Sequence, residues 1–247
     1  MLVETPAQFT ETGLIMKNHQ STSPWISGDL DSLEQLLRDR LPAAVKKDSI
    51  IYYQGDDARD VFIVKSGRVR ITTYAESGLE KQVFIAEKGA IFGELSIFAD
   101  NIYRCSAVAI VDSLIYRIPV TELLDTLKKD WATTEYFIRT LCRKGLTFEQ
   151  EILDLSFMQA IHRIVKTLLN LCDQYGTACT VDGRPGIRIN IRFSHQDVAN
   201  LISSNRVTVS NIFADLAREG LLVKDAGRYV VMDRQALTEL LAQESEG

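Results

Sequence analysis

Apolar positions between Val45 and Val120 come in short runs that are rich in β-branched and aromatic residues. Turn signals separate these runs, among them Gln54-Gly55-Asp56 and Ser66-Gly67. Many short strands joined by regular glycine turns predict a small antiparallel roll. The strands that we expect are residues 49–53, 60–64, 69–74, 82–86, 91–92, 106–110 and 114–118.

The segment before these strands has no comparable pattern. Residues 1–28 are mixed polar, so we expect a weakly structured N-terminal arm that carries an isolated Trp25. The roll domain is then expected to cover residues 29–127, with a short helix that ends before Pro42.

From Thr121 onward the apolar positions follow a helical period. One series repeats with strict spacings of four and three, which is the seam of a coiled coil over roughly three heptads. Its members are Thr134, Ile138, Leu141, Gly145, Phe148, Ile152 and Leu155. We therefore expect a dimerisation helix over residues 128–155, with the last six of these residues at the interface. A helix packed on its own domain is the alternative for the first half.

Ser156 and Gln159 form a capping-box pattern that predicts a new helix and a domain boundary. The last domain is then residues 156–247, and its most ordered stretch is Ser194–Arg218. This stretch predicts two short helices, the first capped by Ser194 and the second by Ser204. The turn between them is polar.

The second helix has an apolar face at i, i+3, i+4 and i+7 spacing, formed by Val209, Ile212, Phe213 and Leu216. A buried helical hairpin is the alternative reading of such a pair. Two short strands around a turn follow at residues 221–232, however, and they are typical of the wing of a winged helix-turn-helix. The expected fold class is thus α+β: an antiparallel β-roll, a long dimerisation helix and a C-terminal winged helix-turn-helix.

Charge and cysteine usage narrow the functional classes. The chain of 247 residues has a net charge of −5, but the stretch 185–234 has a balance of +2. This modest basic patch favours a site-specific binder over a non-specific coater of nucleic acid. The four cysteines show no CxxC spacing, and neither a signal peptide nor an apolar membrane-spanning run is apparent. We expect a cytoplasmic protein without a metal site or cofactor.

The order of these parts resembles the CRP/FNR family of bacterial transcription regulators, over roughly residues 45–235. The resemblance is carried in the roll by Ile51-Tyr-Tyr-Gln54-Gly55, Val61-Phe-Ile-Val64 and Phe92-Gly93-Glu94-Leu95, and beyond it by Arg163–Leu171. It implies a cyclic-nucleotide-binding-like roll whose small-molecule effector controls DNA binding by a homodimer. It also implies a pseudo-palindromic operator of double-stranded DNA and contact with RNA polymerase.

The resemblance also implies an effector site in the roll and on the long helix. Its residues would be Gly93, Glu94, Leu95, Ser96, Tyr103, Arg104, Cys105, Ser106, Phe148 and Glu149. In cyclic-AMP-binding members an Arg-Ser pair and a Thr-Ser pair hold the ligand, whereas this chain has Arg104-Cys105 and Phe148-Glu149.

We therefore expect an effector other than cyclic AMP. An aromatic acid would stack on Tyr103 and Phe148, and Arg104 would bind its carboxylate. The runs Asn101-Ile-Tyr103 and Val207-Thr-Val-Ser210 are similar to the branch that senses chlorinated phenols. A cyclic-AMP-responsive regulator, or one that has lost its ligand, are the alternatives. An iron–sulfur sensor and a haem sensor are disfavoured, because residues 1–104 lack cysteine and the roll lacks histidine.

The second helix of the pair would read the DNA. Arg206 occupies a family position that commonly reads guanine, Val207 can contact a thymine methyl group, and Asn211 can pair with adenine or a phosphate. The remaining candidates for base or phosphate contact are Ser204, Asn205, Thr208, Ser210, His195 and Gln196.

Two other functional classes fit the sequence less well. A regulatory cyclic-nucleotide module of the kind found on kinases would lack a winged helix. An enzyme would need a nucleophile with a base, a metal cluster or a phosphate loop, and none of these patterns is apparent.

Overall fold

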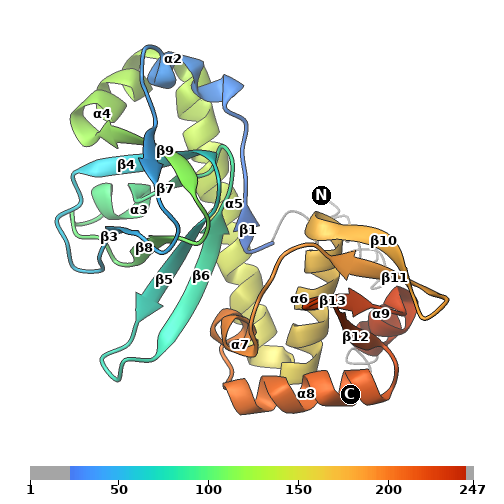
Figure 1. Ribbon diagram of the computed structural model, residues 1–247. Coiled ribbons are helices and arrows are strands. Elements are labelled where there is room, and N and C mark those ends of the chain that lie inside the picture. Colours follow the sequence, from blue (N-terminus) through green and yellow to red (C-terminus); the bar gives the residue numbers. More distant parts are fainter. Residues whose placement is uncertain (1–22, 243–247) are drawn as a thin grey trace, which may run out of the picture.

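The computed structural model describes residues 23–242 and confirms the expected α+β fold class. A β-roll and a smaller C-terminal α/β unit are joined by one long helix that runs between them (Figure 1). Most of the expected N-terminal arm, residues 1–22, lies outside the described residues.

The roll consists of two sheets, with strand orders β1-β6-β5-β8-β3 and β2-β9-β4-β7. All seven expected strands are present within a few residues of their predicted bounds. The strands are Trp25–Ile26 (β1), Ala43–Val45 (β2), Ile50–Tyr52 (β3), Asp60–Ser66 (β4), Val69–Tyr74 (β5), Glu80–Ala86 (β6), Ile91–Phe92 (β7), Ser106–Ala109 (β8) and Ser113–Pro119 (β9). Short helical segments flank them at Asp31–Leu33 (η1), Glu34–Leu37 (α2) and Glu94–Ile97 (α3).

The end of the expected arm is part of the fold, which corrects the prediction of an unstructured segment with an isolated Trp25. Trp25 and Ile26 form β1, which pairs parallel with Ile85 and Ala86 of β6. Ile26 lies in the core of the roll, whereas its neighbour Trp25 packs in the core of the C-terminal unit. Because successive side chains of a strand point to opposite faces, a two-residue strand can join both cores.

The long helix is α5, Trp131–Phe157. The expected span of residues 128–155 was therefore three residues early at its start and two residues early at its end. Residues 128 and 129 belong instead to α4, Val120–Lys129, and Asp130 caps α5 by accepting a hydrogen bond from the Thr133 backbone amide at 3.0 Å. This cap separates two helices that have the same apolar period.

One face of α5 packs against the roll. Its buried residues are Thr133, Phe137, Lys144 and Thr147. The predicted seam lies on a different face, where Ile138 and Ile152 are 49% and 64% exposed. The alternative of a helix that packs its seam on its own domain therefore does not hold for Ile138, although Phe148 does pack at the edge of the roll core.

A buried ion pair fixes α5 to the roll. The Lys144 ammonium lies 2.6 Å from Glu94 Oε1 at the start of α3, and both side chains are 1% exposed. Lys144 Nζ also donates to the Ile91 carbonyl at 2.8 Å and lies 4.6 Å from the centre of the Phe84 ring. A buried charge that loses its partner is costly, so the pair holds the helix in one position against the roll.

The C-terminal unit contains a four-stranded sheet in the order β10-β11-β13-β12. Four helices and two hairpins make up the unit: Ala160–Tyr175 (α6), Gly176–Val181 (β10), Arg184–Ile189 (β11), His195–Ile202 (α7), Arg206–Arg218 (α8), Leu222–Asp225 (β12), Arg228–Val231 (β13) and Arg234–Ala242 (α9). Its core is formed by the apolar faces of α6, α7 and α8, including Leu168, Val198 and Phe213.

Two predicted caps are wrong. Ser156 lies within α5, where its hydroxyl donates to the Ile152 carbonyl at 2.7 Å, and α6 begins only at Ala160 without a side-chain cap from Gln159. Ser204 does not cap α8 either. Asn205 does so, with its side chain accepting from the Thr208 amide at 2.8 Å. A sequence pattern identifies a cap only to within a residue or two, because several polar residues compete for each helix start.

The buried pair predicts a strongly non-additive mutant cycle. Glu94→Gln and Lys144→Met should each lower the free energy of unfolding by about 3–5 kcal/mol, because each leaves one buried charge without its partner. The double substitution should cost clearly less than the sum of the two. Denaturant-induced unfolding measures all three values.

The matched control is Glu135→Gln, which removes the exposed pair with Arg139 at 2.6 Å and should cost less than about 1 kcal/mol. The pair does not fix the helix if the double variant loses as much free energy of unfolding as the two single variants together. The same conclusion follows if neither single variant loses more than the control.

Candidate DNA interface and effector site

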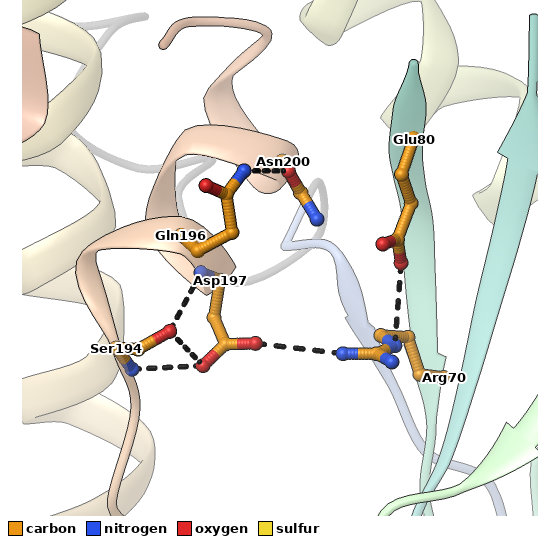
Figure 2. Close-up of polar contacts among 6 residues, drawn as sticks. All are labelled: Arg70, Glu80, Ser194, Gln196, Asp197 and Asn200. Carbon is orange, nitrogen blue, oxygen red and sulfur yellow. Dashed lines mark hydrogen bonds and ion pairs between the residues drawn. The ribbon is translucent and has the colours of Figure 1, made fainter. Parts of the chain in front are cut away.

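Helix α7 begins at a capping box that the sequence predicted. Ser194 Oγ accepts from the Asp197 amide at 3.1 Å, and the Asp197 carboxylate accepts from the Ser194 amide at 2.8 Å (Figure 2). Ser203 then adopts a left-handed conformation with φ of 53° and ends the helix. Ser203 at the end of α7 and Asn205 at the start of α8 together set the tight turn between the two helices.

Helix α8 buries one face and leaves the other exposed. Val209, Phe213 and Leu216 are buried as predicted. The opposite face presents the proposed reading residues Arg206, Asn211 and Ser210 to solvent, together with a Val207 that is 68% exposed. Asn205 is also exposed, and Ser204 and Thr208 are partly exposed. The helix lies at the end of the molecule away from the roll, so the described chain leaves it accessible (Figure 1).

His195 connects α7 to the wing. Its Nε2 atom lies 2.8 Å from the Tyr229 hydroxyl, and its ring centre lies 4.8 Å from that of Phe213. Burial lowers the pKa of His195, and the nearby charges of Lys224 and Arg206 lower it further. The ring is therefore neutral at pH 7, and in this arrangement it supports the wing. Gln196 donates to Asn200 Oδ1 at 2.7 Å.

The wing is the hairpin of β12 and β13, whose residues 225 and 228 pair across a two-residue turn. Lys224 lies over the Tyr229 ring at 5.4 Å, and Arg188 forms an ion pair with Asp225. A cationic hairpin beside an exposed helix is the arrangement with which winged helices contact the DNA backbone.

In the roll, the expected effector residues surround the start of α3. Gly93 has a φ of 86°, and a Cβ atom there would lie 3.2 Å from the Tyr103 ring, so glycine suits this turn on both counts. Glu94 follows as the buried partner of Lys144. Its second oxygen, Oε2, is buried without a hydrogen-bond partner and can therefore accept from a ligand. Nothing in the sequence pattern marks Lys144 as part of this site, because a lysine on a helix is usually solvated.

Tyr103 is buried among aromatic rings. It stacks on Tyr52 with ring centres 3.8 Å apart, and its hydroxyl donates to the Asp60 carbonyl at 2.7 Å. Burial raises the pKa of Tyr103, so its hydroxyl stays protonated. Arg104, in contrast, has a side chain that is 72% exposed and pairs with Asp100. The structure therefore does not bring these two neighbours into one pocket.

The remaining effector candidates lie in different environments. Phe148 packs at the edge of the roll core, and Glu149 is exposed on the other side of α5. Ser96 Oγ accepts from the Arg104 amide at 3.3 Å, and Ser106 Oγ accepts from the Gln54 amide at 2.9 Å. Leu95 is 47% exposed. Burial raises the pKa of the Cys105 thiol, which lies close to Lys144.

Over residues 23–242 no group of three or more His, Cys, Asp or Glu side chains is placed to hold a metal ion. Burial raises the pKa of Cys172 to about 11, which makes that thiol unreactive. None of the described helices is both long enough and apolar enough to cross a membrane.

Comparisons with known proteins agree with this geometry. Residues 42–130 match the cyclic nucleotide-binding domain family, and residues 162–240 match the Crp-like helix-turn-helix domain family. The chain is 31% identical over 177 residues to the global nitrogen regulator of Synechocystis sp., an alignment that covers 70% of this chain and 76% of that protein.

Two solved structures show the same fold. The c-di-GMP responsive regulator CLP of Xanthomonas campestris has a TM-score of 0.71 at 19% identity, covering 83% of this chain and 100% of CLP. CprK complexed with OCPA has a TM-score of 0.65 at 17% identity, covering 89% of this chain and 99% of CprK. Identities this low show the fold and assign no branch. The chain belongs to the CRP/FNR family of transcription regulators, DNA-binding proteins that are not enzymes and that carry an effector-binding domain.

Proposed function

We propose that this chain works as a homodimer that binds a pseudo-palindromic operator under the control of a small molecule in the roll. The observation that carries the proposal is the exposed seam of α5, a helix that is fixed to the roll near its middle by Lys144 and is followed directly by the C-terminal unit. The expected contact with RNA polymerase and the cytoplasmic location belong to the same proposal.

The seam supports a dimer because several of its apolar residues are left exposed by the described part of the chain. Ile138, Ile152 and Leu155 are 49%, 64% and 42% exposed. A Cβ atom on Gly145 would meet nothing within 4 Å, so a second helix can approach closely there. Burying such a stripe against its symmetry copy gives the parallel pairing that the heptad spacing predicts.

The junction after α5 supports transmission of an effector signal. Asp154 near the end of α5 pairs with Lys166 of α6 at 2.6 Å. Arg163 of α6 donates to the Met158 carbonyl at 2.6 Å and to the Ile202 carbonyl of α7 at 3.1 Å. A shift of α5 relative to the roll would thus move α6 and α7 together. An effector controls DNA binding when it binds one of these arrangements more tightly.

For the effector we favour an aromatic acid over cyclic AMP. The departures at Cys105 and at Phe148-Glu149 argue against the cyclic nucleotide. The stacked rings of Tyr52 and Tyr103, buried near Glu94, make this part of the roll aromatic. The similarity of residues 101–103 and 207–210 to the chlorophenol-sensing branch supports the same choice. A cyclic-AMP-responsive regulator and a regulator without a ligand are the alternatives.

The sequence preference at the DNA provides the first test. Arg206→Ala should weaken binding by about 1–3 kcal/mol at one base position, because a bidentate contact with guanine is lost. Selection from a palindromic library, followed by gel shift, measures both affinity and preference. Arg218→Ala, at the far end of the same helix, is the control. An unchanged base preference in Arg206→Ala would refute the assignment, and no specific DNA retained by the parent protein would refute the proposed function.

The dimer has its own test. Ile152→Asp places a charge in the C-terminal half of the seam and should produce monomers. Operator binding should then fall at least tenfold, because two half-sites must be occupied at once. Analytical ultracentrifugation measures the mass. The control is Leu146→Asp, which changes a side chain that is 51% exposed and lies outside the series of seam positions. A monomeric parent protein, or a dimeric Ile152→Asp variant, would contradict the proposal that the seam of α5 forms the dimer interface.

The choice of effector is tested by thermal shift. A phenolic acid such as 4-hydroxyphenylacetate, at about a hundredfold excess over its dissociation constant, should raise the melting temperature by roughly 5 °C, and cyclic AMP should not. Stabilisation by micromolar cyclic AMP alone would favour the alternative.

A further inference from the structure

A cavity of about 310 Å³ lies between the roll and the C-terminal unit, and the site described above does not use it. Both units line it. Arg68 and Arg70 come from the start of β5, Arg192 comes from the segment between β11 and α7, and Trp25 comes from β1. None of the expected effector residues of the roll lines this cavity.

The cavity is cationic, and its charges are incompletely paired. Four cations, Lys47, Arg68, Arg70 and Arg192, face two carboxylates, Asp48 and Asp197. Among the described residues, neither Arg68 nor Arg192 has a carboxylate within ion-pair distance. Arg68 instead lies over the Tyr175 ring at 5.6 Å.

Arg70 is only loosely held. Its guanidinium lies 3.7 Å from Glu80 and 3.4 Å from Asp197, whose other oxygen serves the capping box of α7 (Figure 2). The Nε atom of Arg70 is buried without a hydrogen-bond partner. A planar guanidinium with a free N–H is suited to a second, closer anion.

Trp25 adds a neutral donor to the same cavity. The residue is 6% exposed, and its Nε1 atom is buried without an acceptor. The indole N–H can only donate, and a buried donor that stays unpaired costs about 1–3 kcal/mol. The cavity therefore presents several donors and lacks the acceptor that would satisfy them.

We propose that this cavity binds a compact, doubly charged anion, a dicarboxylate or a phosphate group, as a second ligand separate from the effector of the roll. Arg68 and Arg70 hold the ligand from the roll, and Arg192 holds it from the C-terminal unit. An anion that bridges both units stabilises their docked arrangement and so couples its own concentration to DNA binding.

Trp25 supplies the reporter for a direct test. The chain has two tryptophans, and Trp131 is exposed, so Trp131→Phe leaves Trp25 as the sole tryptophan, whose emission is excited selectively at 295 nm. The full-length protein is titrated with succinate and, separately, with inorganic phosphate at constant ionic strength, without DNA. We expect a saturable change in fluorescence with one of them or with both. The identity of the active anion tells a dicarboxylate ligand from a phosphate ligand.

Charge variants tie the signal to the cavity. Arg68→Gln and Arg192→Gln should each raise the dissociation constant of the active anion at least tenfold, and exposed Arg59→Gln should leave it unchanged. Arg192 is exposed, so its variant should keep the parental melting temperature and circular dichroism. Two results would overturn the proposal: no saturable change with either anion, or equal dissociation constants in all variants. A third result would also overturn it: both cavity variants lose DNA affinity while no anion gives a saturable signal. That result would show that these arginines contact DNA.

Discussion

The buried pair of Lys144 and Glu94 is the contact on which the arrangement of this molecule depends. Two charges that are both almost fully excluded from water tolerate little change in their separation, because either one alone would be strongly destabilising. The pair therefore couples the turn at the candidate effector site to the long helix. Any ligand that reaches the free oxygen of Glu94 acts on the same carboxylate that holds α5 in place.

Polar contacts continue this coupling as far as α7, the helix that precedes α8. Lys166 and Arg163 tie α6 to the end of α5 and to the carbonyl of Ile202, so that no flexible linker separates the two units. The proposed allostery needs only that these units have two arrangements with different DNA affinity. In the proposed dimer, the exposed seam of α5 would hold the two copies of α8 in a fixed relation to each other, because each copy belongs to one half of a symmetric pair.

The N-terminal strand adds a second connection between the units. Trp25 and Ile26 are adjacent in sequence yet belong to different cores. The same strand forms one wall of the cationic cavity, where the indole N–H lacks an acceptor. Docking of the two units is thus stabilised by apolar packing, while the polar groups between them stay incompletely paired. That combination suits an interface whose stability a small anion can adjust.

Local periodicity in the sequence determined the strands of the roll, the amphipathic helices, the capping box at Ser194 and the buried face of α8, because these features depend on neighbours within a few residues. The choice of Asn205 over Ser204 as a cap, and the bounds of α5, needed the backbone itself. Only the tertiary structure joined Lys144 to Glu94, placed Trp25 in a second core and separated Tyr103 from Arg104. Those pairings span long stretches of chain, and no short-range pattern records which distant group will neutralise a buried charge.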